Sequence, residues 1–292
     1  KVSGTERKLR VKKVIGKYAE YALTKIKILY AQRSFEQEGI RVKYLLKKGK
    51  NPDALVIVFS SCTRKGIKAR YNYVRTLSRL NCSRLHILDD YAKDGRGSYY
   101  LGADFTFGEE RAAEALIQKI IRELSPRKVI YCGSSKGGYA ALDFGLQREG
   151  AYIIAGAPQY YLASYLTGDS RDNCTYRHIV GEDSPEKFEA VEYHLRDRIR
   201  EGKYVDTQKI YLHYSDREHT YKEHIRYLLG DLREKGYSVT EDIRDYTSHS
   251  DISYYFPEYL IKTINRIMEE HAENESGGRG GKAVADRTDR TE

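Results

Sequence analysis

Lys128-Val-Ile-Tyr-Cys-Gly-Ser-Ser-Lys-Gly-Gly-Tyr-Ala-Ala-Leu142 begins as an apolar run and continues through a glycine- and serine-rich turn into an alanine-rich segment. Residues 133–137 match G-x-S-x-G, which between a strand and a helix forms the nucleophile elbow of the α/β-hydrolase fold. The elbow is sharp enough that small residues must flank the serine, and Gly133, Gly137 and Gly138 meet that need. The stretch therefore predicts Ser135 as a catalytic nucleophile.

The same stretch also has a simpler interpretation, a tight turn that only packs or binds phosphate. A Walker A loop is excluded, because the pattern G-x-x-x-x-G-K-[ST] does not occur there. In the catalytic interpretation, the backbone N–H of Lys136 is one oxyanion donor. The second donor is expected after an early strand, at the backbone of Ser60 or Ser61, although these two residues could instead only cap the turn.

The base and the acid should follow the nucleophile in the chain order Ser, Asp or Glu, His, on loops after late strands. His249 follows the last predicted strand and is the best placed of the eight histidines. We expect a nitrogen of His249 within about 3.5 Å of Ser135 Oγ. Asp216 is the first carboxylate after the preceding strand and is preferred as the acid, with Glu218 as the alternative. Helix capping or first-turn charge could also explain either carboxylate.

Short β-branched runs alternate with helix-length segments over most of the chain, which is typical of a mostly parallel central sheet with helices on both faces. The predicted strands are 42–46, 55–60, 85–88, 128–132, 152–155, 210–214 and 237–243. The predicted helices are 68–80, 107–124, 137–147, 221–235 and 254–271. The sequence thus predicts the α/β class and, with the elbow, the α/β-hydrolase fold.

Three further segments depart from this alternation. An apolar stripe over residues 14–38 predicts a helix, so residues 1–40 are assigned to an N-terminal accessory helix. The hydrolase domain is expected over residues 41–271, with a cap insertion over about 159–206. Residues 272–292 hold almost no apolar side chain and are expected to be a disordered tail.

Composition limits the partners. The formal net charge is +9, but Lys and Arg are spread along the chain among 42 acidic residues, so nucleic acid is not expected as a partner. The four cysteines form no CxxC pair and no metal-ligand spacing with histidine, and we predict neither a metal nor another cofactor. No run is apolar enough for a membrane span, and a cytoplasmic location is expected.

Over residues 40–265 the chain resembles α/β-hydrolase-like proteins of Gram-positive surface-glycan pathways. These include the XcbB/CpsF capsular polysaccharide biosynthesis proteins and the glycan O-acetylating component of the accessory Sec system. The segments that carry the resemblance are 88–90, 94–102, 133–141, 154–160 and 248–252. The resemblance implies Ser135 and His249 as nucleophile and base, Asp216 or Glu218 as acid, and an acyl group on a sugar or carrier as substrate. It also implies glycan-assembly or secretion proteins as partners.

The leading hypothesis is a serine hydrolase or acyltransferase of polysaccharide biosynthesis, an acetylesterase or an O-acetyltransferase, acting on a surface or capsular glycan or its precursor. Both reactions use the same acyl-enzyme and differ in whether water or a sugar hydroxyl attacks it. The main alternative is a non-catalytic interaction subunit with the same fold, and a peptidase or thioesterase is a third. Six tyrosines in the insertion fit a polar glycan substrate, unless they only pack the cap: Tyr160, Tyr161, Tyr165, Tyr176, Tyr193 and Tyr204.

Overall fold

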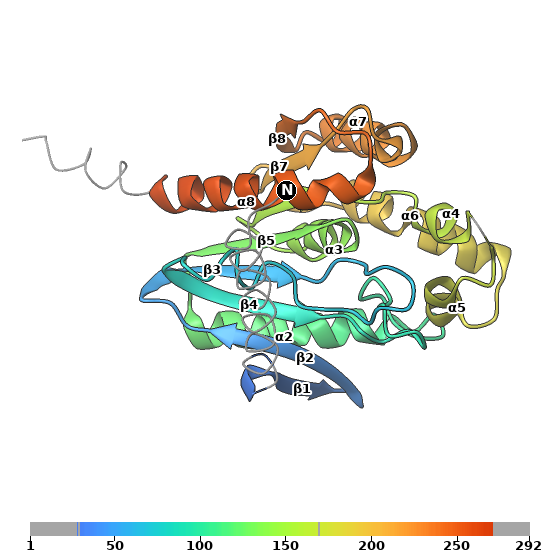
Figure 1. The fold of residues 1–292 in the computed structure, drawn as a ribbon, viewed down its shortest axis with the longest axis horizontal. Coiled ribbons are helices and arrows are strands. Elements are labelled where there is room, and N and C mark those ends of the chain that lie inside the picture. Colours follow the sequence, from blue (N-terminus) through green and yellow to red (C-terminus); the bar gives the residue numbers. More distant parts are fainter. Residues whose placement is uncertain (1–27, 29, 169, 271–292) are drawn as a thin grey trace, which may run out of the picture.

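The computed structural model describes residues 28, 30–168 and 170–270, which fold around one eight-stranded sheet. The order across the sheet is β1-β2-β4-β3-β5-β6-β7-β8, running from one edge to the other in Figure 1. The strands are β1 Arg33–Gln37, β2 Ile40–Lys47, β3 Asn51–Phe59, β4 Cys82–Leu88, β5 Lys128–Ser134, β6 Tyr152–Gly156, β7 Lys209–Tyr214 and β8 Ser238–Ile243. The β1/β2 and β2/β4 pairs are antiparallel, and every later pair is parallel.

The central strands are buried on both faces because helices cover the sheet on each side. In β3, Leu55, Ile57 and Phe59 belong to one buried cluster, whereas Val56 and Val58 belong to another. Side chains alternate between the faces of a strand, so the two clusters lie on opposite faces of the sheet. The buried apolar core therefore consists of two layers. Because the strands from β4 to β8 are parallel, their carboxyl ends all lie at the same end of the sheet.

Four long helices contribute to the first cluster and one to the second. The first layer holds α2 Gly108–Leu124, α3 Lys136–Gly145, α6 Pro185–Arg200 and α7 Arg226–Lys235, and the second holds α8 Ile252–Glu269. A π-helical turn, Tyr221–Ile225, precedes α7, and a short 3₁₀ helix, His249–Asp251, precedes α8. A mostly parallel eight-stranded sheet with helices on both faces confirms the predicted α/β-hydrolase-like fold. None of the described helices combines the length and apolar character needed to cross a membrane.

All seven predicted strands and four of the five predicted helices are present, but the helix predicted over 68–80 is wrong. That segment consists of turns, and Tyr73 has a φ of 58°, which a helix cannot accommodate. Asn72 and Tyr73 instead direct their side chains to Ser61 and Ser134 near the elbow. Tertiary hydrogen bonds have therefore replaced the local helical preference.

The N-terminal prediction is partly corrected. Most of the helix expected over residues 14–38 lies outside the described residues, as does the tail expected over 272–292. Residues 33–37 form β1 instead of a helix end. The two-residue turn Glu38-Gly39, with φ values of 52° and 77°, closes a hairpin with β2, because both positive angles suit the turn that joins twisted strands.

The region 159–206 contains two short helices, α4 Leu162–Thr167 and α5 Cys174–Val180, followed by α6. Figure 1 shows α4 and α5 beyond one end of the sheet, whereas α6 packs against α3 and α7. The last third of the predicted insertion is therefore part of the layer that covers the sheet. Tyr160 and Tyr176 are fully buried, so these two of the six tyrosines pack the fold.

Candidate active site

Ser135 occupies the turn between β5 and α3 with φ 53° and ψ −123°, a conformation that is strained for a residue with a side chain. The flanking glycines make this turn possible. A Cβ on Gly133 would lie 2.3 Å from the carbonyl oxygen of Gly137, and one on Gly137 would lie 2.7 Å from that of Phe59. Because backbone atoms line both positions, any larger residue would displace the elbow.

His249 lies beside Ser135 and is the first residue of the 3₁₀ helix that follows β8. Its Nε2 lies 2.9 Å from Ser135 Oγ, within the distance expected from the sequence. Ser135 is 9% exposed, so a small substrate can still reach a nucleophile that is largely shielded from bulk water. In this geometry the serine hydroxyl donates to the imidazole, which can accept its proton during attack.

Glu218, on the loop after β7, contacts the other nitrogen of the His249 imidazole. Its Oε1 accepts a hydrogen bond from His249 Nδ1 at 2.5 Å and another from Thr220 Oγ1 at 2.8 Å. Glu218 is 1% exposed. A buried carboxylate in this position fixes the imidazole tautomer that presents Nε2 to the serine.

Asp216, the acid preferred from the sequence, does not make the contact to His249 that this role requires. Asp216 is exposed, and His249 hydrogen-bonds to Glu218 instead. The chain forms a turn directly after β7 that turns Asp216 outward, and it returns to the interior at Glu218. The alternative acid named from the sequence thus occupies the position.

Lys136 is the first residue of α3, so its N–H has no partner within the helix and lies beside the nucleophile. The predicted second donors are in a different situation. The N–H of Ser60 donates to Tyr100 Oη at 2.7 Å, and the N–H of Ser61 donates to Asn72 Oδ1 at 2.9 Å. Internal acceptors thus occupy the two N–H groups that the sequence offered as the second oxyanion donor.

Gln159 approaches Ser135 from another side and was missed by the sequence reasoning. Its Nε2 lies 3.2 Å from Ser135 Oγ, and its Oε1 accepts a hydrogen bond from Tyr99 Oη at 3.2 Å. Gln159 and Tyr99 are buried. The available signal was position: Gln159 follows β6 at the edge of the sheet where β5 ends in the elbow.

A buried ion pair fixes the elbow to the loop after β4. Lys136 Nζ lies 2.8 Å from Asp89 Oδ2 and also donates to the carbonyl oxygen of Arg96 at 2.9 Å. Both charged side chains are almost fully buried. Asp89 in turn accepts hydrogen bonds from the N–H groups of Ser98 and Tyr100, so the segment that carries Tyr99 is held against the nucleophile turn.

The segment between β3 and β4 gives the edge of the site a positive charge. This segment, residues 60–81, contains six basic residues and no acidic residue: Arg64, Lys65, Lys68, Arg70, Arg75 and Arg79. The four cations between residues 64 and 70 are exposed. Ser61, at the start of this loop, donates to the carbonyl oxygen of Ser134 at 2.8 Å. The loop is thereby anchored beside Ser135, and its charge favours an anionic ligand.

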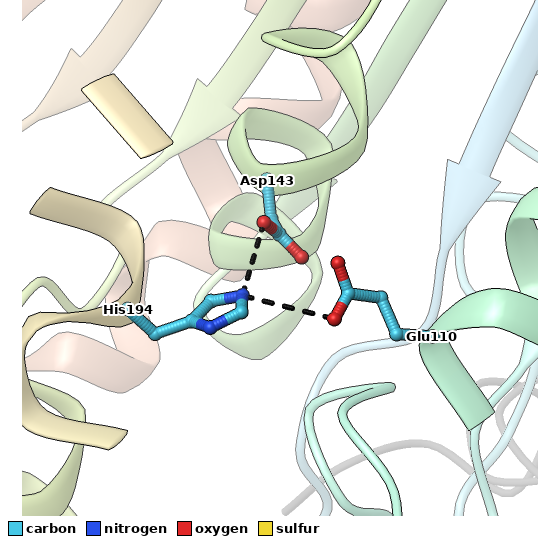
Figure 2. Close-up of side chains that lie close together, drawn as sticks. All are labelled: Glu110, Asp143 and His194. Carbon is cyan, nitrogen blue, oxygen red and sulfur yellow. Dashed lines mark ion pairs between the residues drawn. The ribbon is translucent and has the colours of Figure 1, made fainter. Parts of the chain in front are cut away.

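A second polar cluster lies away from the nucleophile, between α2, α3 and α6. Figure 2 shows Glu110, Asp143 and His194 pointing toward one another, with ligand atoms within 4.8 Å of each other. Arg198 already supplies positive charge there, bonding Glu110 Oε1 at 2.6 Å and Asp143 Oδ1 at 3.0 Å. Burial, followed by the nearby Asp143 carboxylate, raises the pKa of Glu110 to about 7. The cluster fits an internal ion network that joins three helices, and the absence of a metal remains a prediction.

No protein-family model and no curated protein matches the sequence. Among solved structures, the chain is similar to the capsule O-acetyltransferase of Neisseria meningitidis serogroup A, at 26% identity and a TM-score of 0.66. That match covers 79% of this chain and 92% of the other. A histidine variant of the same enzyme in complex with CoA matches at 25% identity.

Two more distant structures share the fold alone. The Gap123 glycosylation-associated complex of Streptococcus agalactiae is 17% identical with a TM-score of 0.64, covering 82% of this chain and 46% of that one. An S-formylglutathione hydrolase of Agrobacterium tumefaciens is 15% identical with a TM-score of 0.55, covering 82% and 94%. Together with the match to the capsule O-acetyltransferase, they confirm the resemblance to surface-glycan proteins of α/β-hydrolase type.

Proposed function

We propose that this chain is a serine-dependent O-acetyltransferase that acts on a surface or capsular glycan or its precursor. The observation that carries the proposal is the continuous hydrogen-bonded line from Ser135 through His249 to Glu218. A non-catalytic subunit has no need of a strained serine, a shielded imidazole and a buried carboxylate in this order.

The proposed reaction has two halves. Ser135 Oγ attacks the acyl carbonyl of the donor while His249 Nε2 takes the hydroxyl proton, and His249 then gives that proton to the leaving group. The products of this half are the acyl ester of Ser135 and the free donor. In the second half His249 accepts the proton of a sugar hydroxyl, the sugar oxygen attacks the acyl ester, and the proton returns to Ser135.

The nature of the donor is supported by charge and by similarity. The basic loop beside the elbow, with Arg64, Lys65, Lys68 and Arg70, favours a donor that carries phosphate groups. The similar capsule O-acetyltransferase has been solved with CoA, which is such a molecule. We therefore propose an acyl-CoA as the acetyl donor. The donor is a substrate, and the chemistry requires no resident cofactor.

The acceptor is proposed to enter beside α4 and α5, where residues 159–184 act as a cap. Tyr161 and Tyr165 are partly exposed in this region, and aromatic faces beside charged groups suit sugar rings better than acyl chains. Assembly proteins of the same glycan pathway are the proposed partners, and the proposed location is the cytoplasm, where an acyl-CoA is available.

The proposal predicts a preference for short acyl groups and transfer to a glycan. We expect hydrolysis of p-nitrophenyl acetate but not of the decanoate, because aromatic and charged side chains in the proposed cap suit a polar sugar better than a long acyl chain. With acetyl-CoA and candidate glycans, mass spectrometry should detect acetylated glycan, and the Ser135→Ala variant should yield none. Faster turnover of the decanoate would contradict the glycan proposal. A protein inert toward every ester would indicate the non-catalytic alternative.

A further inference from the structure

The oxyanion site has one clear backbone donor, the N–H of Lys136, and the fold normally takes a second from the loop after an early strand, here β3. Ser60 and Ser61, the residues in that position, have their N–H groups bonded to Tyr100 Oη and Asn72 Oδ1. The Tyr100 hydroxyl is buried and also donates to the carbonyl oxygen of Ile87, so it is held in place. A tetrahedral intermediate on Ser135 would therefore find the N–H of Lys136, whereas the N–H groups of Ser60 and Ser61 already have internal acceptors.

The side-chain amide of Gln159 is a buried donor in direct contact with the nucleophile. Its Nε2 is 3.2 Å from Ser135 Oγ. In the intermediate the negatively charged oxygen is only two bonds from Oγ, so a small shift brings the amide to the roughly 2.7–3.1 Å that an oxyanion donor requires. An amide N–H can only donate, and its preorganised dipole in a buried site costs little reorganisation during the reaction.

The backbone of Tyr99 and Tyr100, the segment that contacts this amide, is strained. Tyr99 and Tyr100 both have positive φ values, 59° and 62°, which are uncommon for aromatic residues. Tyr99 Oη donates to Gln159 Oε1 at 3.2 Å and thereby turns Nε2 toward the serine. Tyr100 Oη accepts the hydrogen bond from the N–H of Ser60. Strain of this kind persists where the surrounding structure enforces it, and such residues cluster at functional sites. The Asp89–Lys136 ion pair supplies that enforcement.

We propose that the Gln159 side-chain amide is the second oxyanion donor of this enzyme, with Tyr99 as the residue that positions it. The inference rests on the proposed acyl-transfer function of Ser135. It assigns to a side chain after β6 the task that a backbone N–H after β3 performs in the usual form of the fold.

The test compares Gln159→Glu, which replaces the donating amide by a carboxylate of the same shape, with Gln159→Ala. We expect kcat for p-nitrophenyl acetate to fall by about 10²–10³-fold with little change in KM, as for the loss of one oxyanion donor. The affinity for a boronic acid, which forms a tetrahedral adduct with Ser135, should fall by a similar factor. Tyr99→Phe keeps the Gln159 amide but removes the hydroxyl that orients it. A smaller fall in kcat and in boronic acid affinity is therefore expected.

Gln208→Glu is the matched control. Gln208 is equally buried, and its amide donates to the carbonyl oxygens of Gly145, Leu146 and Arg148, at the opposite end of α3 from the elbow. This variant should lower the melting temperature and leave kcat per folded molecule unchanged. If Gln159→Glu does not fold, Gln159→Ala and Tyr99→Phe carry the same test.

Two results would overturn the assignment. One is a kcat for both Gln159 variants within about threefold of the wild type, and the other is a lower kcat with unchanged boronic acid affinity. Either result leaves the proposed function intact as long as Ser135→Ala abolishes turnover. A wild-type protein that turns over no ester, or a Ser135→Ala variant that remains active, would instead contradict the proposed function itself.

Discussion

Ser135→Ala is expected to lower kcat for ester turnover by about 10⁶-fold, because the acyl-enzyme can no longer form. The residual rate would come from binding and from the oxyanion donors alone. Steady-state kinetics with p-nitrophenyl acetate measures the loss. Alanine is smaller than serine and fits the same elbow, so the melting temperature should stay close to that of the wild type.

Ser134→Ala is the matched control for this prediction. Ser134 precedes the nucleophile, and its hydroxyl contacts Tyr73 Oη at 2.6 Å and Ser61 Oγ at 3.0 Å. Removal of that hydroxyl should reduce stability more than activity, since His249 hydrogen-bonds to Ser135. A Ser135→Ala variant that keeps its activity while Ser134→Ala loses it would reassign the nucleophile.

Glu218→Ala is expected to lower kcat by about 10⁴-fold, whereas Asp216→Ala should have little effect. Glu218 Oε1 holds His249 Nδ1, and without this partner the imidazole can adopt the wrong tautomer and loses support for its positive charge. Asp216 is exposed and is therefore a control that removes the same charge two residues away. The two variants are compared by kcat at equal folded concentration.

Glu218→Gln sharpens this comparison, because it keeps the shape of the side chain and removes the charge. A fall of similar size to that of Glu218→Ala is expected if the carboxylate acts on the imidazole. Full activity of Glu218→Ala together with an inactive Asp216→Ala would restore the assignment preferred from the sequence and contradict the observed geometry.

The elbow was predictable because its determinants are local. The strand, the tight turn and the helix occupy residues 128–145, and glycine is needed where a Cβ would meet the backbone of Gly137 or Phe59. His249 was predictable for a related reason, since the order of strands along the chain fixes which loops reach the carboxyl edge of the sheet.

The acid was ambiguous because sequence position does not specify side-chain direction. Asp216 and Glu218 lie on the same loop, and the turn after β7 decides which of them faces His249. From the sequence, Asp216 was preferred as the first carboxylate after the strand, because the charge of a first helical turn explains Glu218 more simply. The structure places the longer side chain inward.

The oxyanion region could not be predicted because distant segments decide it. Tyr100 and Asn72 occupy the N–H groups of Ser60 and Ser61, and Gln159 reaches the nucleophile from the loop after β6. The bond of Asn72, with that of Tyr73 to Ser134, also explains why residues 68–80 form turns in place of the predicted helix. Sequence periodicity indicates local secondary-structure preference and contains no information on hydrogen bonds between distant segments.

The most direct test of the account is covalent labelling of the folded protein with a fluorophosphonate, followed by peptide mass spectrometry. Such probes react with a serine that is activated by a neighbouring base. The account predicts one adduct on Ser135 in the native protein, a much slower reaction in His249→Ala, and none after heat unfolding. A folded protein with no adduct, or with an adduct on another residue while Ser135 stays unmodified, would contradict the assignment of Ser135 as the nucleophile.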